Sequence, residues 1–326
     1  MTDQPVGQED LVWFSERFQA VSENIERVIQ GKRDVVELVV LCLLAEGHVL
    51  IEDVPGVGKT LLAKSLARSI HCEFQRIQFT PDLLPSDVTG VSVWDRERGS
   101  FVFRAGPVFT NIVLGDEINR ASPKTQAALL EAMEERQVTV DGNTRRLPPP
   151  FMVIATQNPI EHEGTYPLPE AQLDRFMMRV VMGYPSRAKE LEMLETHGVK
   201  STYDDLEPVV TGDDVTRMIE VARRVYVSDP VKEYLVDAVE ATREDPDLLL
   251  GASPRATLFL QRAARTRAAI EGRHYVIPDD VKAVMRPVLI HRMILRPEAQ
   301  MRGATIEEIV EGIAQGIPVP GTRVKA

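Results

Sequence analysis

Residues 49–67 constrain the fold of this chain more than any other stretch. An apolar run at residues 49–51 is typical of a short buried strand, and the loop sequence EDVPGVG follows it. Lys59-Thr60 then opens a segment whose apolar residues have helical spacing. A strand, a glycine-bearing loop, a Lys-Thr pair and a helix form the layout of a phosphate-binding P-loop.

The residues of this loop suit phosphate. Small residues let backbone N–H groups close around phosphate oxygens, and the helix N-terminus adds its own donors and the positive end of its dipole. Lys59 is expected to reach the β- and γ-phosphates, and the Thr60 hydroxyl to hold Mg²⁺. Asp53 stands where the general pattern G-x-x-x-x-G-K-[ST] has its first glycine, so a negative charge is expected near the phosphates.

The composition indicates a folded, soluble protein of about two domains. The chain has 326 residues, of which 27% are charged and 44% hydrophobic. A net charge of −11 disfavours a general binder of nucleic acid, which normally carries a basic face. Cys42, Cys72 and the six scattered histidines lack metal-type spacing, which disfavours a metal site made of protein ligands alone.

The N-terminal ten residues are polar and acidic, unlike a signal peptide. The longest apolar run, residues 35–45, contains Glu37 and is too short to span a bilayer. We therefore expect no membrane insertion and a cytoplasmic location.

Apolar strands that alternate with helices predict an α/β fold with a parallel sheet covered on both faces. Helices are expected over residues 11–30 and 35–44, after the P-loop and from Ser122-Pro123 onward, and strands over residues 49–51, 73–79, 111–117 and 151–156. Ligands bind at the carboxyl ends of such strands. The P-loop, Asp116-Glu117 and Asn158 all fall at such ends, which predicts one shared site.

Two β-hairpins are expected within this domain. One spans residues 91–103, and the other pairs residues 138–140 with 145–147 around Asp141-Gly142. Residues 80–88, with two prolines, predict a loop or broken helix. Beyond residue 186 strand signals become sparse, and helices are expected around residues 187–197, 213–226, 230–243, 254–271, 278–292 and 305–315. The predicted division is an α/β domain at 1–186 and a helical domain at 187–326.

Polar residues at the strand ends are the candidates for chemistry. Asp116 is expected to orient Mg²⁺, directly or through water, and Glu117 to polarise the attacking water. Two carboxylates at a buried strand end are costly without a compensating cation, although a solvated acidic turn is the plain alternative. Asn158 is a candidate contact for the water or the γ-phosphate, and a simple Asn-Pro turn is its alternative.

Arg175 and Arg255 are candidate charge-stabilising cations, because an arginine finger contributes roughly 10³–10⁵ in rate to phosphoryl transfer. A lone surface arginine usually has no such role, so the residue type alone does not decide between the two readings.

Taken together, these motifs resemble the MoxR-type AAA+ ATPases. The segments that carry the resemblance are VPGVGKT, DEINRASPKTQAALLEAMEE, ATQNPIEHEGTYPLPEAQLDRF and GASPRA, within a match from about Ile29 to about Leu295. The resemblance implies a P-loop AAA+ parallel sheet sandwiched by helices, with inserted β-hairpins and a C-terminal helical lid domain. The hairpins are similar to the helix-2 insert and the pre-sensor-1 insert of that branch.

The resemblance also implies a role for each candidate. Glu117 belongs to Walker B, Asn158 is sensor 1, Arg175 the arginine finger and Arg255 sensor 2, and residues 28–31 would lie against adenine. The implied metal ligands are Thr60 of Walker A and Asp116 of Walker B. The implied nucleotide-binding residues are Val28, Ile29, Gly31, Pro55, Gly56, Val57, Gly58, Lys59, Thr60 and Leu61.

By the same resemblance, the chain would be a Mg²⁺-dependent ATPase that binds ATP and forms a ring, usually a hexamer, in which Arg175 reaches a neighbour's γ-phosphate. Chaperone-like remodelling or activation of client proteins is implied, often beside a partner with a von Willebrand factor A domain. Two alternatives stay open. One is an AAA+ nucleic-acid motor, which Arg145-Arg146 could serve by touching a phosphate backbone, and the other is a magnesium-chelatase-like motor subunit.

Overall fold

The computed structural model describes residues 6–159, 164–191 and 203–320. Its helices are α1 (Gln8–Glu26), α2 (Arg33–Leu44), α3 (Lys59–Ser69), α4 (Pro85–Thr89), α5 (Pro123–Glu135), α6 (Glu170–Leu173), α8 (Gly212–Arg223), α9 (Asp229–Glu244), α10 (Pro254–Ile270), α11 (Pro278–Leu289), α12 (Pro297–Met301) and α13 (Ile306–Gly316). Two 3-10 turns are η1 (Ile118–Arg120) and η2 (Ile290–Arg292).

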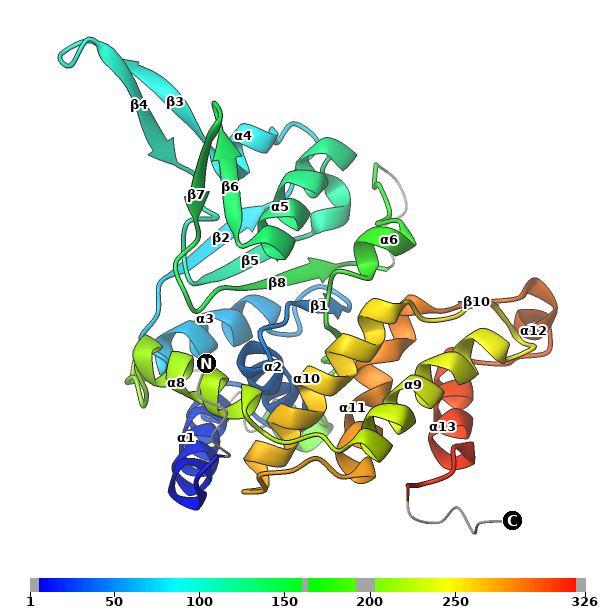
Figure 1. The fold of residues 1–326 in the computed structure, drawn as a ribbon. Helices are drawn as coiled ribbons and strands as arrows, with labels where there is room; N and C mark the ends of the chain where they lie inside the picture. Colours follow the sequence, from blue (N-terminus) through cyan, green and yellow to red (C-terminus); the bar gives the residue numbers. More distant parts are fainter. Residues whose placement is uncertain (1–5, 160–163, 192–202, 321–326) are drawn as a thin grey trace.

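The strands are β1 (Val49–Glu52), β2 (Phe74–Gln78), β3 (Gly90–Asp95), β4 (Ser100–Ala105), β5 (Ile112–Asp116), β6 (Gln137–Val140), β7 (Asn143–Arg146), β8 (Met152–Gln157), β9 (Met178–Val180), β10 (Leu248–Leu250) and β11 (Ile294–Leu295). Five of them form a parallel sheet in the order β2-β5-β8-β1-β9 (Figure 1). The predicted parallel sheet is therefore confirmed.

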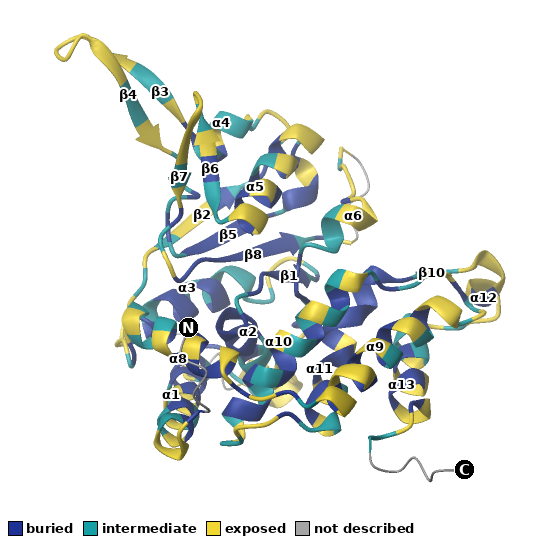
Figure 2. Ribbon diagram, in the orientation of Figure 1, coloured by how far each residue is buried: buried dark blue, intermediate teal, exposed yellow. Residues whose placement is uncertain are grey.

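Helices cover both faces of this sheet, and the strands alternate between two hydrophobic clusters. One cluster packs α1, α2 and α3 against the sheet and continues into the C-terminal helices, and the other lies under α5. Val49 and Ile51 of β1 belong to the first cluster and Leu50 to the second. Because successive residues of a strand face opposite sides, a strand covered on both faces needs apolar residues on both. Figure 2 shows β1, β5 and β8 mostly buried, whereas β2, at the edge of the sheet, is partly exposed.

Both predicted hairpins are present. β3 pairs antiparallel with β4, and β6 with β7. They project from the sheet at the upper left of Figure 1. Trp94 and Phe101 form an edge-to-face pair on the first hairpin, with ring centroids 5.2 Å apart, and both side chains are exposed.

The C-terminal part is a helical lid, as predicted. α10 lies at its centre and packs against α1, α2, α8, α9 and α11. Pro254 and Pro278 occupy the first turns of α10 and α11, where a missing N–H costs nothing. The helix predicted over residues 187–197 is helical at 187–191, and its remainder lies outside the described residues. The boundary at residue 186 stays a prediction.

The structure corrects the sequence-based elements in several places. α1 ends at Glu26 and not near residue 30. The short helix α4, at residues 85–89, agrees with the loop or broken helix predicted over residues 80–88 and extends one residue beyond it. The strand β9 was not predicted, and neither were β10 and β11, because two or three residues are too few to show a period. Within the described ranges, no helix is both long and apolar enough to cross a membrane.

Candidate functional site

The P-loop joins the carboxyl end of β1 to the start of α3. Gly56 and Gly58 have φ angles of +85° and +93°, which side-chain-bearing residues rarely adopt. Apart from Gly56 and its two chain neighbours, no described residue has an atom within 4 Å of the position that a Cβ on Gly56 would take. Gly58 is the N-cap of α3, and no side chain of the described residues caps this helix. Its first N–H groups are therefore available to an anion.

Asp53 and Lys59 make hydrogen bonds that hold the P-loop together. The Asp53 carboxylate accepts hydrogen bonds from the backbone N–H of Val54 at 2.7 Å and of Gly183 at 2.5 Å. Nζ of Lys59 donates to the carbonyl oxygen of Asp53 at 2.7 Å. Asp53 is buried, and two backbone donors hold its charge between the P-loop and the chain that leaves β9.

Residues 28–31 lie beside the P-loop. Val28 and Ile29 are buried, and Cδ1 of Ile29 is 3.9 Å from the position of a Cβ on Gly58. Gly31 has a φ of +70°, which lets the chain turn after α1. The structure thus brings this segment next to the phosphate loop, and its contact with adenine stays a prediction. Within the loop, Pro55 and Gly56 are exposed and residues 57–61 are half-buried.

The carboxylate of Asp116 ends β5 and is held from two sides. Arg76 of β2 donates to Oδ2 through Nε at 3.0 Å and through Nη2 at 2.7 Å. Oγ1 of Thr156, on β8, donates to Oδ1 at 2.5 Å. Asp116 is 8% exposed, so the guanidinium of Arg76 provides the compensating cation that this buried carboxylate requires, whereas the half-buried Glu117 pairs with Arg120.

Glu117 follows in a left-handed conformation with a φ of +56°, which costs a non-glycine residue about 1–3 kcal/mol. Its N–H donates to Oγ1 of Thr156 at 2.8 Å. Its Oε2 accepts from Nε2 of Gln78 at 2.7 Å and from Nη1 of Arg120 at 3.0 Å. Thr156 therefore ties both carboxylate residues to β8.

Asn158 comes directly after β8 and is 5% exposed. Since β1, β5 and β8 are parallel neighbours, the P-loop, Asp116-Glu117 and Asn158 lie along one edge of the sheet. We call this the carboxyl edge. The structure thus brings these predicted residues together.

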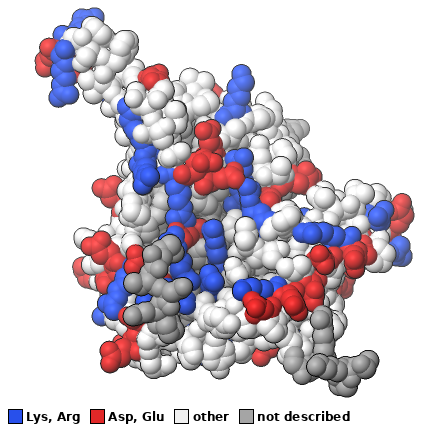
Figure 3. All heavy atoms as spheres, in the orientation of Figure 1, with Lys and Arg blue, Asp and Glu red and all other residues white. Residues whose placement is uncertain are grey.

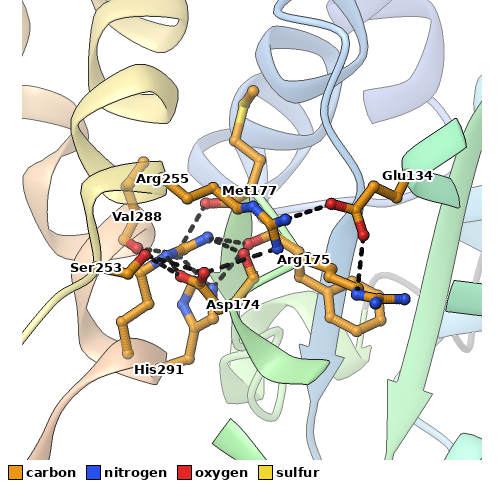
Figure 4. A network of polar contacts seen from close by, with 10 residues as sticks. Glu134, Asp174, Arg175, Met177, Ser253, Arg255, Val288 and His291 are labelled. Carbon is orange, nitrogen blue, oxygen red and sulfur yellow. Dashed lines mark hydrogen bonds and ion pairs between the residues drawn. The ribbon is translucent and has the colours of Figure 1, made fainter. Parts of the chain in front are cut away.

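Arg175 and Arg255 lie at the other end of the strands, which we call the amino edge. Arg175 precedes β9, and nearby the N–H of Met177 donates to the carbonyl of His48, just before β1, at 2.8 Å. Arg255 is in the first turn of α10. Both side chains contact Glu134 of α5: Nε of Arg175 is 3.2 Å from Oε2, and Nη2 of Arg255 reaches Oε1 (Figure 4).

Behind this pair, Asp174 connects the α/β part to the lid (Figure 4). Oγ of Ser253 donates to its carboxylate at 2.9 Å, and Nε of Arg292 does so at 3.0 Å. Nη1 of Arg255 lies 3.7 Å from Oδ2. The Arg292 side chain is 1% exposed, and burial lowers its pKa to about 10 while the charge of Asp174 opposes that shift.

A surface hollow adjoins the two arginines. It is lined by Glu46, Gly47, His48, Met133, Glu134, Arg136, Arg175, Arg255, Leu258, Phe259 and Arg262. Figure 3 shows several Lys and Arg side chains over the middle of this face, between the α/β part and the helices below it. His48 stays neutral there, because burial lowers its pKa to about 3. Its Nδ1 accepts from the N–H of Val153, and its Nε2 contacts the carbonyl of Met133.

Comparison with known proteins identifies the family. The ATPase family associated with various cellular activities (AAA) matches residues 48–178, and the AAA lid domain matches residues 240–313. The chain is 42% identical to Chaperone MoxR1 of Mycobacterium tuberculosis, over 97% of this chain and 86% of that protein. It belongs to the MoxR family of AAA+ ATPases.

Other members of the family agree over most of their length. The chain is 52% identical to the uncharacterised protein YeaC of Bacillus subtilis, over 92% of this chain and 94% of that one. It is 32% identical to Protein MoxR of Methylorubrum extorquens, over 91% and 93% respectively. A crystal structure from Cytophaga hutchinsonii, provisionally assigned as an ATPase, superposes with a TM-score of 0.88 at 38% identity, covering 95% of this chain and 97% of that one.

Membership of the MoxR family implies nucleotide binding, and the carboxyl edge fits Mg²⁺ and a triphosphate. The open glycine loop, the uncapped α3 and Lys59 suit phosphate oxygens. The Thr60 hydroxyl and the Asp116 carboxylate are oxygen ligands of the kind Mg²⁺ takes, together with water and phosphate. In the described part of the chain, no three His, Cys, Asp or Glu side chains gather into a metal cluster. The donor set suits an ion that arrives with a nucleotide.

Sequence reasoning missed several residues of this MoxR-type site, namely Arg76, Gln78, Thr156, Glu134 and Asp174. Arg76 and Gln78 lie two apart on β2, so they share the face of the strand that meets Asp116 and Glu117. Thr156 carried a signal, because it is a polar residue at the end of an otherwise apolar strand. Glu134 and Asp174 carried none, since their partners lie far away in the sequence.

Proposed function

We propose that this protein is a Mg²⁺-dependent ATP hydrolase that assembles head-to-tail into a ring and remodels or activates client proteins. One observation carries the proposal: the residues that one active site needs lie on two opposite edges of the sheet. β1 has four residues and β8 has six. At about 3.3 Å per residue, the edges are roughly 13–20 Å apart. An arginine of the amino edge would therefore serve the P-loop of an adjacent copy.

The carboxyl edge would bind and orient the reactants. When bound, Mg²⁺·ATP supplies the γ-phosphoryl group and the metal charge that neutralises its oxygens. The P-loop N–H groups and Lys59 would hold the phosphates, and Thr60 and Asp116 would hold the metal. Glu117, fixed by its hydrogen bonds to Gln78 and Thr156, would accept a proton from the attacking water.

The amino edge would complete the site of the neighbouring subunit. Arg175 and Arg255 share one carboxylate at this edge, so both are proposed to act in trans. Charge that develops on the transferring phosphoryl group would then be stabilised by two guanidiniums. Hydrolysis becomes conditional on assembly, because an isolated subunit lacks these cations at its own P-loop.

Two observations support an action on client proteins: the name of a relative and the exposed aromatic residues of one hairpin. The M. tuberculosis relative is named a chaperone. The projecting β3–β4 hairpin exposes Trp94 and Phe101, which suits contact with protein segments. A hexameric ring, a von Willebrand factor A domain partner and a cytoplasmic location stay predictions. The nucleic-acid motor is not proposed, because the net charge is −11.

Mixed subunits test the proposal. Lys59→Ala removes a phosphate contact and Arg175→Ala removes the finger, so each homogeneous assembly should hydrolyse little ATP. In an equal mixture, about a quarter of head-to-tail contacts pair an intact P-loop with an intact arginine edge, and phosphate release should recover in proportion. Copurification of differently tagged subunits verifies mixed assembly. Absence of recovery in verified mixed assemblies would overturn the trans arrangement.

A further inference from the structure

The carboxylate of Glu134 contacts two guanidiniums, one through each oxygen. Oε2 contacts Arg175 at 3.2 Å, and Oε1 contacts Arg255 (Figure 4). Arg175 belongs to the α/β part, whereas Arg255 belongs to the lid, so the carboxylate bridges the two parts, next to the contacts that Asp174 makes with Arg255 and Ser253. Two neighbouring guanidiniums repel each other, and the negative charge between them offsets this repulsion.

The exposure of the three side chains argues against a purely structural role. Glu134 is 37% exposed, Arg175 30% and Arg255 33%. Ion pairs at such exposure contribute little to folding. The same exposure leaves both guanidiniums open to an anion from outside the subunit, whereas the nearby Arg292 is enclosed with Asp174. Glu134 thus holds two guanidiniums that an outside anion can reach, whereas Asp174 behind them holds the lid against the α/β part.

We propose that Glu134 is a positioning residue that holds Arg175 and Arg255 together as a two-armed receptor for the terminal phosphate of the nucleotide on the adjacent subunit. This inference rests on the proposed function. Asp174 steadies the second arm, since it contacts Nη1 of Arg255 and accepts a hydrogen bond from Ser253 in the preceding loop. The phosphate carries more negative charge than the shared carboxylate, so both arms can transfer to it once it arrives.

Glu134→Gln keeps the size of the side chain and removes its charge. The arms should then separate, and kcat should fall roughly tenfold, less than the loss of about 10³–10⁵ expected when a finger is deleted. KM for ATP should not change, because the subunit's own P-loop is untouched. Glu134→Asp retains the carboxylate and should recover part of the rate. Glu135→Gln removes the same charge from the exposed next residue of α5 and serves as the control.

Mixing Glu134→Gln subunits with Lys59→Ala subunits shows whether the Glu134 variant impairs the arginines that serve a neighbour or the catalysis at its own P-loop. The Glu134→Gln subunit has an intact P-loop, and the Lys59→Ala subunit has an intact pair of arms. In the mixture, turnover should rise above that of either homogeneous assembly. Assembly of each variant is checked beforehand by size-exclusion chromatography.

The two mixtures distinguish failure of the role of Glu134 from failure of the proposed function. If the Arg175→Ala mixture recovers and the Glu134→Gln mixture does not, the role of Glu134 is overturned and the proposed function stands. If neither mixture recovers, both are overturned. An unchanged kcat for Glu134→Gln, or an equal loss for Glu135→Gln, also overturns the positioning role.

Discussion

The carboxyl edge of the sheet takes its polar groups from the ends of adjacent strands, whereas the amino edge takes Arg175 and Arg255 from two parts of the chain that meet only through tertiary packing. At the carboxyl edge, Thr156 links Asp116 and Glu117 within a few residues of the sheet. At the amino edge, Glu134 and Asp174 make the links, and the lid supplies most of the partners.

This contrast teaches where each half of the proposed site is vulnerable. The carboxyl edge depends on the sheet, so changes there should alter chemistry with small structural consequences. The amino edge depends on how the lid packs on the α/β part, so changes there should affect stability and assembly together. Four variants or conditions test this contrast.

Glu117→Gln should have the largest effect. Removing the proposed base lowers kcat by about 10²–10⁴. ATP affinity should be retained, since the P-loop is intact. Phosphate release and ATP titration measure the two quantities, and Glu131→Gln on the exposed face of α5 is the charge-matched control. Normal turnover in the Glu117 variant would place the base elsewhere.

Asp174→Asn should be the strongest test of the amino edge. It removes the charge partner of Arg292, whose side chain is 1% exposed. Breaking one partner of a buried pair costs about 3–5 kcal/mol of the free energy of unfolding. Chemical denaturation measures the loss. Asp229→Asn, at an exposed carboxylate, should change stability little, and a comparably small loss for Asp174→Asn would argue against anchoring by this network.

Thr156→Val should have an intermediate effect at the carboxyl edge. The substitution leaves the N–H of Glu117 without its acceptor, which costs about 1–3 kcal/mol of unfolding free energy. It should also lower kcat, because Asp116 and Glu117 lose a common anchor. Thr266→Val is the control, since that hydroxyl donates within α10, to the carbonyl of Arg262. Equal losses in both variants would remove the special role of Thr156.

Mild acid should have the smallest effect. The pKa of His48 falls from an ordinary value of 6.5 to about 3 through burial, so the folded state binds fewer protons than the unfolded state. Its contribution to stability is full above pH 6.5 and is lost as the pH falls toward 3, by at most about 1.4 kcal/mol per pH unit. Denaturation at several pH values measures the slope. His48→Asn should flatten it, and an unchanged slope would contradict the assignment.

The sequence predicted the carboxyl edge well because local rules govern it. A P-loop requires glycines, Lys59 and Thr60 at set spacing, and the ends of apolar parallel strands must meet at one edge. The parallel sheet, both hairpins and a mostly helical C-terminal part followed from the patterns of apolar and turn residues, and the resemblance implied that this part is a lid. β9 escaped detection because it has three residues, although it lies next to β1 and leads to Gly183, the partner of Asp53.

The amino edge could not be predicted in the same way. Arg175 and Arg255 were recognised as residue types in suggestive contexts, but nothing in the sequence pairs both with Glu134. Such ion pairs depend on the angle at which α10 approaches α5, which arises from packing among many helices. The sequence also gave no sign that the Asp53 carboxylate turns toward Gly183, because that contact needs β9 in place.

In the proposed assembly, the opposite placement of the two edges would also govern how copies join. In the proposed head-to-tail assembly, each copy would contribute one carboxyl edge and one amino edge. Every row of copies would then end with one unpaired edge of each kind until the last copy meets the first. Six copies close only when each contact rotates the next by about 60°, and any pitch along the axis produces a growing spiral instead. Since the lid carries part of the amino edge, the ion pairs around Asp174 would help to set that rotation, and thereby the choice between a closed ring and an open filament.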